Sequence, residues 1–146
     1  MNALSMQAID PIIKLLGSNG EWLAEINIVS ITLRLLLAVI FGGFIGVERA
    51  TKRHAAGLRT YILVSFGATV VMLVNQYLYE VFETGDVARL GAQVISGIGF
   101  LGAGTILVTQ RNRIRGLTTA AGLWACACMG LAIGVGFYTL AMVSFV

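Results

Sequence analysis

The sequence has few charged residues and a single proline. Of its 146 residues, 12% are charged and 58% are hydrophobic, and the mean hydropathy is +0.88. Soluble domains ordinarily carry about 25% charged residues, and a water-soluble fold could not bury this much apolar surface. The composition is also uniform, with no low-complexity linker. We therefore expect a single membrane domain.

Side chains that commonly bind metal ions are scarce. His54 is the one histidine and has no cysteine near it in the sequence. Cys126 and Cys128 are two residues apart in an apolar run, so on a helix they point roughly 200° apart. Such a pair neither holds one ion nor forms a disulfide. We expect no metal site and no cofactor, and we interpret both cysteines as small packing residues.

Apolar runs of membrane-spanning length are what the sequence does contain. A spanning helix needs about 20 predominantly apolar residues. Four runs meet this length, and together they predict an all-α membrane protein, a compact bundle of four to five transmembrane helices with close packing at glycines. The predicted spans are 28–47, 60–79, 90–109 and 117–134, with a partial span at 137–146, in one domain at 28–146.

The last apolar run is too long for one comfortable helix. Gly134-Val135-Gly136 is the expected turn, and residues 137–146 beyond it are too short to cross the bilayer. Either the natural chain continues beyond Val146, or this segment docks as a half-helix against its neighbours.

Residues 1–27 form a leader to the first span. They include Asp10 and Lys14 and lack the continuous apolar core of a signal peptide, so insertion by the first helix is expected. Ile9, Ile12, Ile13 and Leu16 recur at helical spacing after an early Pro11, which is consistent with a short interfacial helix. A tail without a defined role is the equally open alternative.

Lysine and arginine in short loops predict the orientation. The segments 48–59 and 110–116 are basic, whereas the connection 80–89 is acidic. Positive loops are retained in the cytoplasm, so both basic loops should face inside and the N-terminus outside.

Glycines recur at spacings that place small residues on one helix face. In lipid such faces allow close helix contact, within the chain or, as the less favoured alternative, between subunits. A hinge in 97–104 whose carbonyls line an ion site is a further alternative. The predicted packing glycines are Gly42, Gly46, Gly97, Gly99, Gly102, Gly104, Gly130 and Gly134.

Two charges in the first span require partners. Arg34 lies about two turns inside the span, where it should either snorkel to the outer interface or pair with an acid on the same side, such as Asp86 or Glu80. Glu48 lies at the opposite helix end, where the dipole disfavours an acid, so we expect it to pair with Arg59 or Arg115. We further expect a polar cluster at the cytoplasmic end that unites Glu48, Arg49, Arg59, Arg115, Thr118 and Thr119, with a threonine capping the fourth span.

Four motifs in order resemble the membrane domain of the MgtC/SapB family. The resemblance covers about residues 32–142. Family members often have Asp-Pro before the arginine preceding the third span, where this chain has Asp86-Val87-Ala88-Arg89, and many carry a soluble C-terminal domain that is absent from this sequence. The motifs are Gly46-Val47-Glu48-Arg49, Ala56-Gly57-Leu58-Arg59-Thr60, the run from Gln93 to Gly104, and Arg115-Gly116-Leu117-Thr118-Thr119-Ala120-Ala121 with Trp124.

This resemblance implies a bacterial inner-membrane protein linked to adaptation to magnesium limitation and, in some pathogens, to virulence. No Gly-Lys-Ser/Thr phosphate loop is present, so an enzymatic function such as ATP hydrolysis is not expected. We expect a regulatory protein whose partners are the lipid bilayer, a second copy in a homodimer or other homo-oligomer, and another membrane protein, but no nucleic acid. The functional candidates are Arg34, Glu48, Arg49, Arg59, Asp86, Arg89, Gln93, Ser96, Arg115, Thr118, Thr119 and Trp124.

Two other functions remain open. A small oligomeric ion transporter or channel could line a path with Arg34, Glu48, Asp86, Gln93 and Ser96, although the spans contain no acid between their ends. A lipid-interacting or structural dimerisation module would use the same glycines and basic loops.

Overall fold

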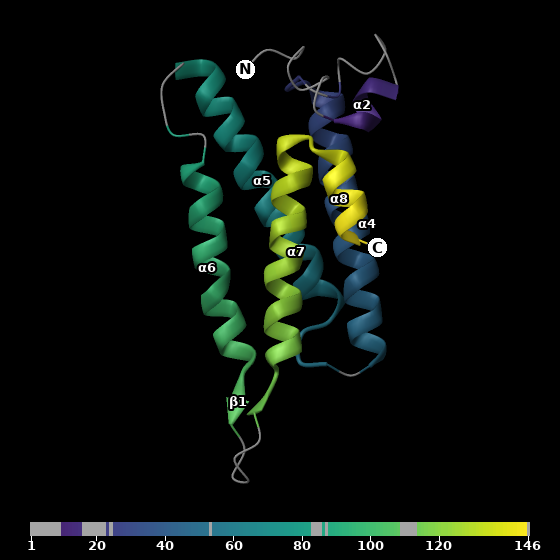
Figure 1. Cartoon of the computed structure of the whole chain (residues 1–146), viewed down its shortest axis with the longest axis vertical. Coiled ribbons are helices and arrows are strands. Elements are labelled where there is room, and N and C mark those ends of the chain that lie inside the picture. Colours follow the sequence, from purple (N-terminus) through teal and green to yellow (C-terminus); the bar gives the residue numbers. More distant parts are fainter. Residues whose placement is uncertain are drawn as a thin grey trace.

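The structure is a computed structural model that describes residues 10–15, 23, 25–52, 54–82, 86, 88–108 and 114–145. Its described part is an elongated bundle of helices (Figure 1). In chain order the elements are α2 (Pro11–Leu15), α4 (Ile28–Thr51), α5 (Leu58–Phe82), α6 (Arg89–Thr105), β1 (Leu107–Val108), β2 (Ile114–Arg115), α7 (Leu117–Val135) and α8 (Tyr138–Phe145).

The all-α membrane fold is confirmed. Helices α4, α5 and α7 are each long and apolar enough to cross a bilayer, with mean hydropathies of 2.3, 1.5 and 1.6. Helix α6 has 17 residues and runs beside them (Figure 1). At about 1.5 Å per residue it is about 25 Å long, slightly shorter than the ~30 Å hydrocarbon core.

The predicted third span, 90–109, is too long. Helix α6 ends at Thr105, whose hydroxyl donates to the Gly102 carbonyl oxygen at 2.8 Å. The backbone then becomes extended at Ile106, and β1 pairs antiparallel with β2. Extended backbone competes with the helix here because residues 106 and 108 are β-branched and favour strands.

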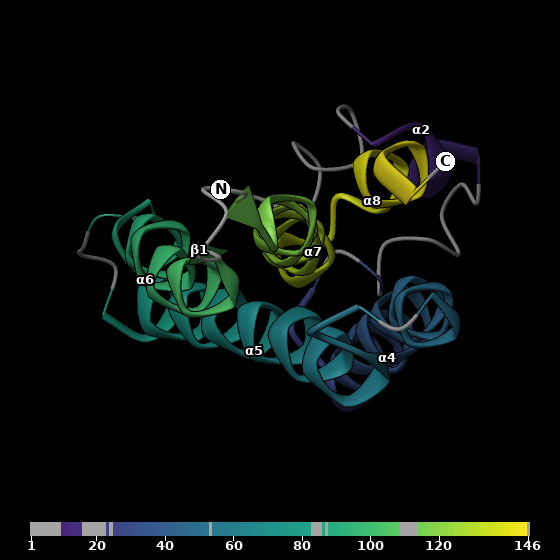
Figure 2. The same ribbon diagram turned by 90° about the horizontal axis from the view of Figure 1, so that it is seen from below.

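Helix α5 is the centre of the bundle. Its most extensive contacts are with α4 and α7, and α6 packs mainly on α7. Seen along the bundle, α5 lies below α7 and extends from α6 on the left to α4 on the right (Figure 2).

Two glycines of α4 allow its close contact with α5. A Cβ atom built on Gly42 would lie 2.8 Å from the Tyr61 carbonyl oxygen, and one on Gly46 would lie 2.7 Å from the Leu58 Cα atom. Both distances are too short for any side chain larger than hydrogen. Gly42 and Gly46 therefore pack within the chain, against α5.

Helix α7 meets the other side of α5 in the same way. A Cβ atom on Gly130 would lie 2.4 Å from the Ser65 carbonyl oxygen, and one on Gly134 would lie 2.8 Å from the Thr69 carbonyl oxygen. The Thr69 hydroxyl also donates to the Gly130 carbonyl oxygen at 2.8 Å. Close approach thus lets a backbone acceptor of one helix bind a side chain of the next.

The glycines of α6 differ from those of α4 and α7. Gly102 makes an ordinary contact with Ala120, at 3.4 Å between the built Cβ atom and the alanine Cβ atom. A Cβ atom on Gly97, Gly99 or Gly104 would meet nothing within 4 Å among the described residues. Intramolecular packing is therefore wrong for these three. The alternative hinge at 97–104 is also wrong, because α6 is a continuous helix.

The C-terminal segment docks as a half-helix, as predicted. Gly136 ends α7 with a φ of 88°, a left-handed conformation that favours glycine. Helix α8 then folds back beside α4, where Phe145 stacks on Phe41 with ring centroids 5.1 Å apart. Near the start of α8, buried Tyr138 packs with buried Ile13 of α2.

The two ends of the bundle differ in charge. The end of α4, the start of α5 and the β1–β2 pair lie together at one end (Figure 1). We call this the basic end, formed by residues 48–59 and 114–119. The opposite end, with α2, the end of α5 and the α7–α8 turn, is the α2 end. The basic segments thus share one side, whereas the direction in which that side faces stays a prediction, as does the domain boundary at residue 27.

Candidate functional site

Arg34 is fully buried near the α2 end. Its guanidinium donates to Gln76 Oε1 at 2.9 Å, to the Gly134 carbonyl oxygen at 2.9 Å and to the Leu23 carbonyl oxygen at 2.8 Å. Its Nε also donates to the Tyr138 hydroxyl at 3.2 Å. These acceptors on separate segments form what we call the arginine cluster: Arg34, Gln76, Tyr138 and the carbonyls of Leu23 and Gly134.

Snorkelling of Arg34 is wrong, and so are Glu80 and Asp86 as its named partners. The side chain does not snorkel, because none of its surface reaches solvent. Nor are Glu80 and Asp86 among its hydrogen-bond partners, and both of these acids are exposed. Oxygens inside the bundle take their place, since a buried guanidinium needs several acceptors in fixed directions.

The Gly134 carbonyl is available because of how α7 ends. The backbone N–H groups of Gly136 and Phe137 bond to the carbonyls of Ala132 and Ile133. The Gly134 carbonyl therefore has no such partner at the helix end and accepts from Arg34. A cation at a helix C-terminus also interacts favourably with the helix dipole.

Asp10 fastens the leader to the same region. It is buried, accepts from the Ile12 backbone N–H at 3.0 Å, and accepts from both the backbone N–H and the hydroxyl of Thr139. The carboxylate thus caps α2 and holds the start of α8. The Leu23 carbonyl accepts from Ser30 Oγ and from the Tyr138 hydroxyl as well as from Arg34. Leader, α4 and α8 therefore meet at one oxygen.

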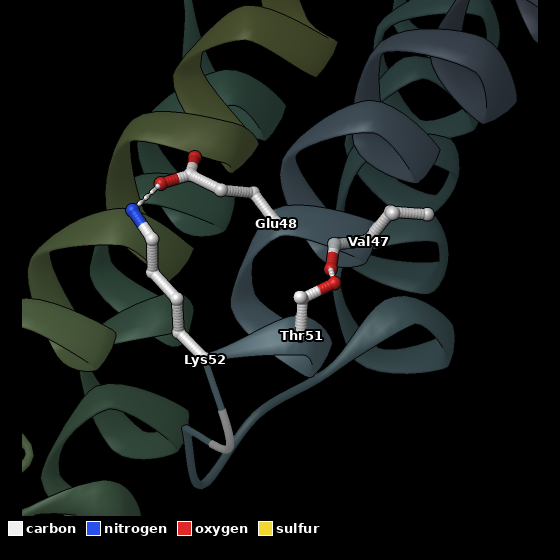
Figure 3. Close-up of polar contacts among 4 residues, drawn as sticks. All are labelled: Val47, Glu48, Thr51 and Lys52. Atoms are coloured by element: carbon white, nitrogen blue, oxygen red, sulfur yellow. Dashed lines mark hydrogen bonds and ion pairs between the residues drawn. The ribbon is translucent and has the colours of Figure 1, made fainter.

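Glu48 at the basic end does not have the predicted partner. It accepts from Lys52 Nζ at 2.6 Å, one helical turn away on α4 (Figure 3). The two side chains are 52% and 61% exposed. Pairing with Arg59 or Arg115 is therefore wrong, because an i,i+4 lysine reaches Glu48 without any tertiary contact.

The predicted polar cluster at this end does not form. Arg59, Arg115 and Thr118 are exposed, whereas Thr119 is buried and accepts from the Tyr61 hydroxyl through its carbonyl, at 3.5 Å. Neither threonine caps α7.

Gly116 takes the capping position of α7 instead, with a φ of 93° and no side-chain cap. A Cβ atom there would lie 1.9 Å from the Thr105 carbonyl oxygen. The turn between β2 and α7 therefore accepts only glycine, which leaves Thr118 and Thr119 inside the helix rather than before it.

Among the charged members of the predicted cluster, Arg49 is the one that is partly buried. It is half-buried, and its Nε atom is shielded from solvent yet has no hydrogen-bond partner among the described residues. The positive charge of Arg49 lies close enough to Glu48 and to buried Tyr61 to interact with both electrostatically.

The exposed face of α6 carries three further candidates, Arg89, Gln93 and Ser96. Arg89, Gln93, Ser96, Phe100 and Gly104 are exposed and recur at spacings of four, three, four and four residues, so they form one stripe along the helix. We call it the α6 stripe.

Two further candidates lie outside that stripe. Asp86 accepts from the Ala88 backbone N–H at 2.9 Å in the turn before α6. Trp124 is half exposed on α7.

Comparison with known proteins identifies the family. The model of the MgtC family matches residues 35–146. The chain belongs to the MgtC family. The match begins one residue after Arg34, so Asp10 and the Leu23 carbonyl lie outside the part that the MgtC family model describes.

Curated relatives of the MgtC family cover most of this chain. It is 45% identical to "Putative magnesium transporter YhiD" of Escherichia coli K12 over 113 residues, 74% of this chain and 52% of that protein. It is 43% identical to "Protein MgtC" of Salmonella typhimurium over 110 residues, 75% and 46% of the two chains.

"Protein SapB" of Bacillus subtilis is 40% identical over 121 residues, 78% of this chain and 51% of that protein. The chain thus spans about half the length of the curated relatives it matches. No solved structure matches it.

Sequence reasoning missed three members of the site, Asp10, Gln76 and Tyr138. For Asp10 a signal existed, because an aspartate directly before proline is a favoured helix cap. Gln76 lies in a long apolar run, where a polar side chain predicts an interhelical hydrogen bond. Tyr138 carried no distinguishing signal.

Proposed function

We propose that this MgtC-family protein is a regulatory, non-enzymatic membrane protein that acts by lateral helix contact. It would take part in adaptation to magnesium limitation. The resemblance to the MgtC/SapB family implies a role in virulence as well. The partner would be a second copy or another membrane protein. The observation that carries the proposal is the α6 stripe.

The α6 stripe is unsuited to lipid alone. Gln93 and Ser96 are exposed in the segment that runs beside the spanning helices. An amide facing hydrocarbon without a partner is unfavourable, and polar side chains commonly join membrane helices by hydrogen bonds. A Cβ atom built on Gly104 of the stripe, or on the adjoining Gly97, would meet nothing within 4 Å among the described residues. A partner helix could approach closely there and supply the missing hydrogen bonds.

The alternative is a small oligomeric ion transporter or channel. It draws support from the name of the E. coli relative, which calls that protein a magnesium transporter. Within one chain the interior is unfavourable for a cation, since the buried charge in the described spans belongs to Arg34. A magnesium path requires carboxylate, carbonyl and water oxygens around the ion. Such a path would have to lie between chains.

Gly97→Leu tests the contact surface. Because a Cβ atom at Gly97 meets nothing, the substitution should leave the fold unchanged but block close approach of a partner helix. We expect normal thermal stability in detergent, loss of complementation of growth in low magnesium, and reduced crosslinking to a partner in membranes.

Gly67→Leu is the matched control. Gly67 is an exposed glycine of α5 that also meets nothing within 4 Å, so leucine there changes a different lipid-facing position. It should preserve growth and crosslinking. If Gly97→Leu is as active as Gly67→Leu, the α6 stripe is not the working surface. Ion flux into liposomes containing the purified chain would instead favour transport.

The proposed location is the bacterial inner membrane with the N-terminus outside. His54 is exposed in the loop of the basic end. A His54→Cys variant should react with a membrane-impermeant maleimide only after cells are permeabilised. Reaction in intact cells would reverse the orientation.

A further inference from the structure

The guanidinium of Arg49 has one buried nitrogen that lacks a hydrogen-bond partner within the part of the chain that the structure describes. Its Nε atom is buried and has no acceptor among the described residues. A buried donor left unpaired is unfavourable, and more so when it is charged. Buried polar groups without protein partners are commonly satisfied by a bound ion, ligand or water.

The carboxylate next to Arg49 in the sequence is bound by another cation. It belongs to Glu48 and is bound by Lys52 at 2.6 Å (Figure 3). The described residues of the basic end carry four basic side chains and this one carboxylate. They are Arg49, Lys52, Arg59 and Arg115, with Glu48 as the acid. The surplus of positive charge favours an anionic ligand from outside the chain.

Arg49 lies at headgroup depth. Helix α4 has 24 residues and is therefore about 36 Å long, which exceeds the ~30 Å hydrocarbon core. Arg49 is in its last turn. Lipid phosphates lie at this depth, and arginine binds phosphate oxygens through a planar fork of N–H donors.

We propose that Arg49 is the centre of a binding site for the phosphoryl group of an anionic phospholipid in the leaflet at the basic end. The phosphate oxygens accept from the guanidinium, and the surrounding cations attract the negative headgroup. Arg34 is not such a site, because protein oxygens already bind its guanidinium. This proposal is independent of the α6 stripe.

The test compares two arginines of the basic end. The full chain is purified in detergent, and binding of phosphatidylglycerol and phosphatidylcholine is measured by native mass spectrometry. We expect the wild type to prefer phosphatidylglycerol. Arg49→Gln should lower that affinity about tenfold or more, the loss expected from one charge-assisted hydrogen bond. Arg59→Gln removes an exposed charge at the same end and should change the affinity less than about threefold.

The conservative variant guards against misfolding. Arg49→Lys keeps the charge but loses the fork, so it should give an affinity between wild type and Arg49→Gln, whereas Arg59→Lys should match wild type. Equal losses for the Arg49 and Arg59 variants would overturn the proposal in favour of diffuse attraction. An equal affinity for both lipids in the wild type would overturn it as well.

Inorganic phosphate separates the two sources of the ligand. Added at constant ionic strength, it should not raise the melting temperature of the wild type, whereas phosphatidylglycerol should. An Arg49-dependent rise with phosphate and none with the lipid would overturn the lipid assignment and identify a soluble phosphate compound.

Discussion

Two arginines of α4, Arg34 and Arg49, lie on nearly the same face of the helix toward opposite ends, and they differ in their hydrogen-bond partners. The buried face of α4 carries Arg34, Ala38, Gly42 and Gly46, and Arg49 follows one turn later. Arg34 is bound by oxygens from four other parts of the chain, namely the leader, α5, α7 and α8. Arg49 has a shielded Nε that no described residue accepts from.

The difference lies in the backbone that each arginine meets. Near Arg34, α7 ends and α8 begins, so carbonyls without helical partners are available. Near Arg49, α5 begins, and the start of a helix presents N–H groups rather than carbonyls. A guanidinium donates hydrogen bonds only. The guanidinium of Arg34 therefore finds hydrogen-bond acceptors at its end of α4, whereas the Nε atom of Arg49 finds none among the described residues.

Arg34→Ala should have the largest effect. It leaves the Leu23 and Gly134 carbonyls without their donor inside the bundle, and we expect the free energy of unfolding to fall by about 3 kcal/mol or more. Denaturant unfolding in detergent measures this. Arg49→Ala is the comparison and should lower the value by less than about 1 kcal/mol. Similar losses at both positions would abolish the distinction between the two ends.

Gly134→Ala should come next. The added Cβ atom would lie 2.6 Å from the Met72 Cβ atom, so α7 must move away from α5 and carry the Gly134 carbonyl away from Arg34. We expect a loss of about 1–3 kcal/mol in the same measurement. Gly97→Ala is the control and should cause no loss, because its Cβ atom meets nothing within 4 Å.

Asp10→Asn should have a smaller, local effect. The carboxylate binds Thr139, so its neutral amide replacement weakens the attachment of α2 to α8 by about 1 kcal/mol. Hydrogen exchange should become faster in residues 10–15 and at the start of α8, while the protection of α5 stays unchanged. Uniformly faster exchange would mean that the leader supports the whole bundle rather than its α2 end.

Glu48→Gln should have the smallest effect. Its pair with Lys52 is exposed, and exposed i,i+4 pairs contribute little. We expect an unchanged melting temperature at physiological salt. A marked drop would show that Glu48 supports a tertiary contact at the basic end and would restore part of the predicted cluster.

Patterns of apolar residues and glycine predicted much of the fold. The start of α4 at Ile28, the turn after Val135 and the packing of Gly42 and Gly130 follow from run length, glycine pairs and spacing of four. Such features depend on local sequence. The end of α6 at Thr105 was missed because an apolar run does not show where helix gives way to strand.

Partners of the polar side chains were predicted less well. For Arg34 the acceptors include two backbone carbonyls, which every residue possesses, so residue identity carries no signal for them. For Glu48 a tertiary arginine was expected, although Lys52 stood four residues away on the same helix. The local partner should have been preferred, because it requires no knowledge of the fold.

The arginine cluster also has a consequence for biosynthesis. Gly134 follows Arg34 by 100 residues and Tyr138 follows it by 104. At a translation rate of about 5–20 residues per second, Arg34 is made roughly 5–20 seconds before either acceptor exists. The first span therefore enters the membrane with a charge that its own helix cannot satisfy. Only after the α7–α8 turn has emerged from the ribosome can the Arg34 guanidinium bind the Gly134 carbonyl and Tyr138 and become buried in the bundle.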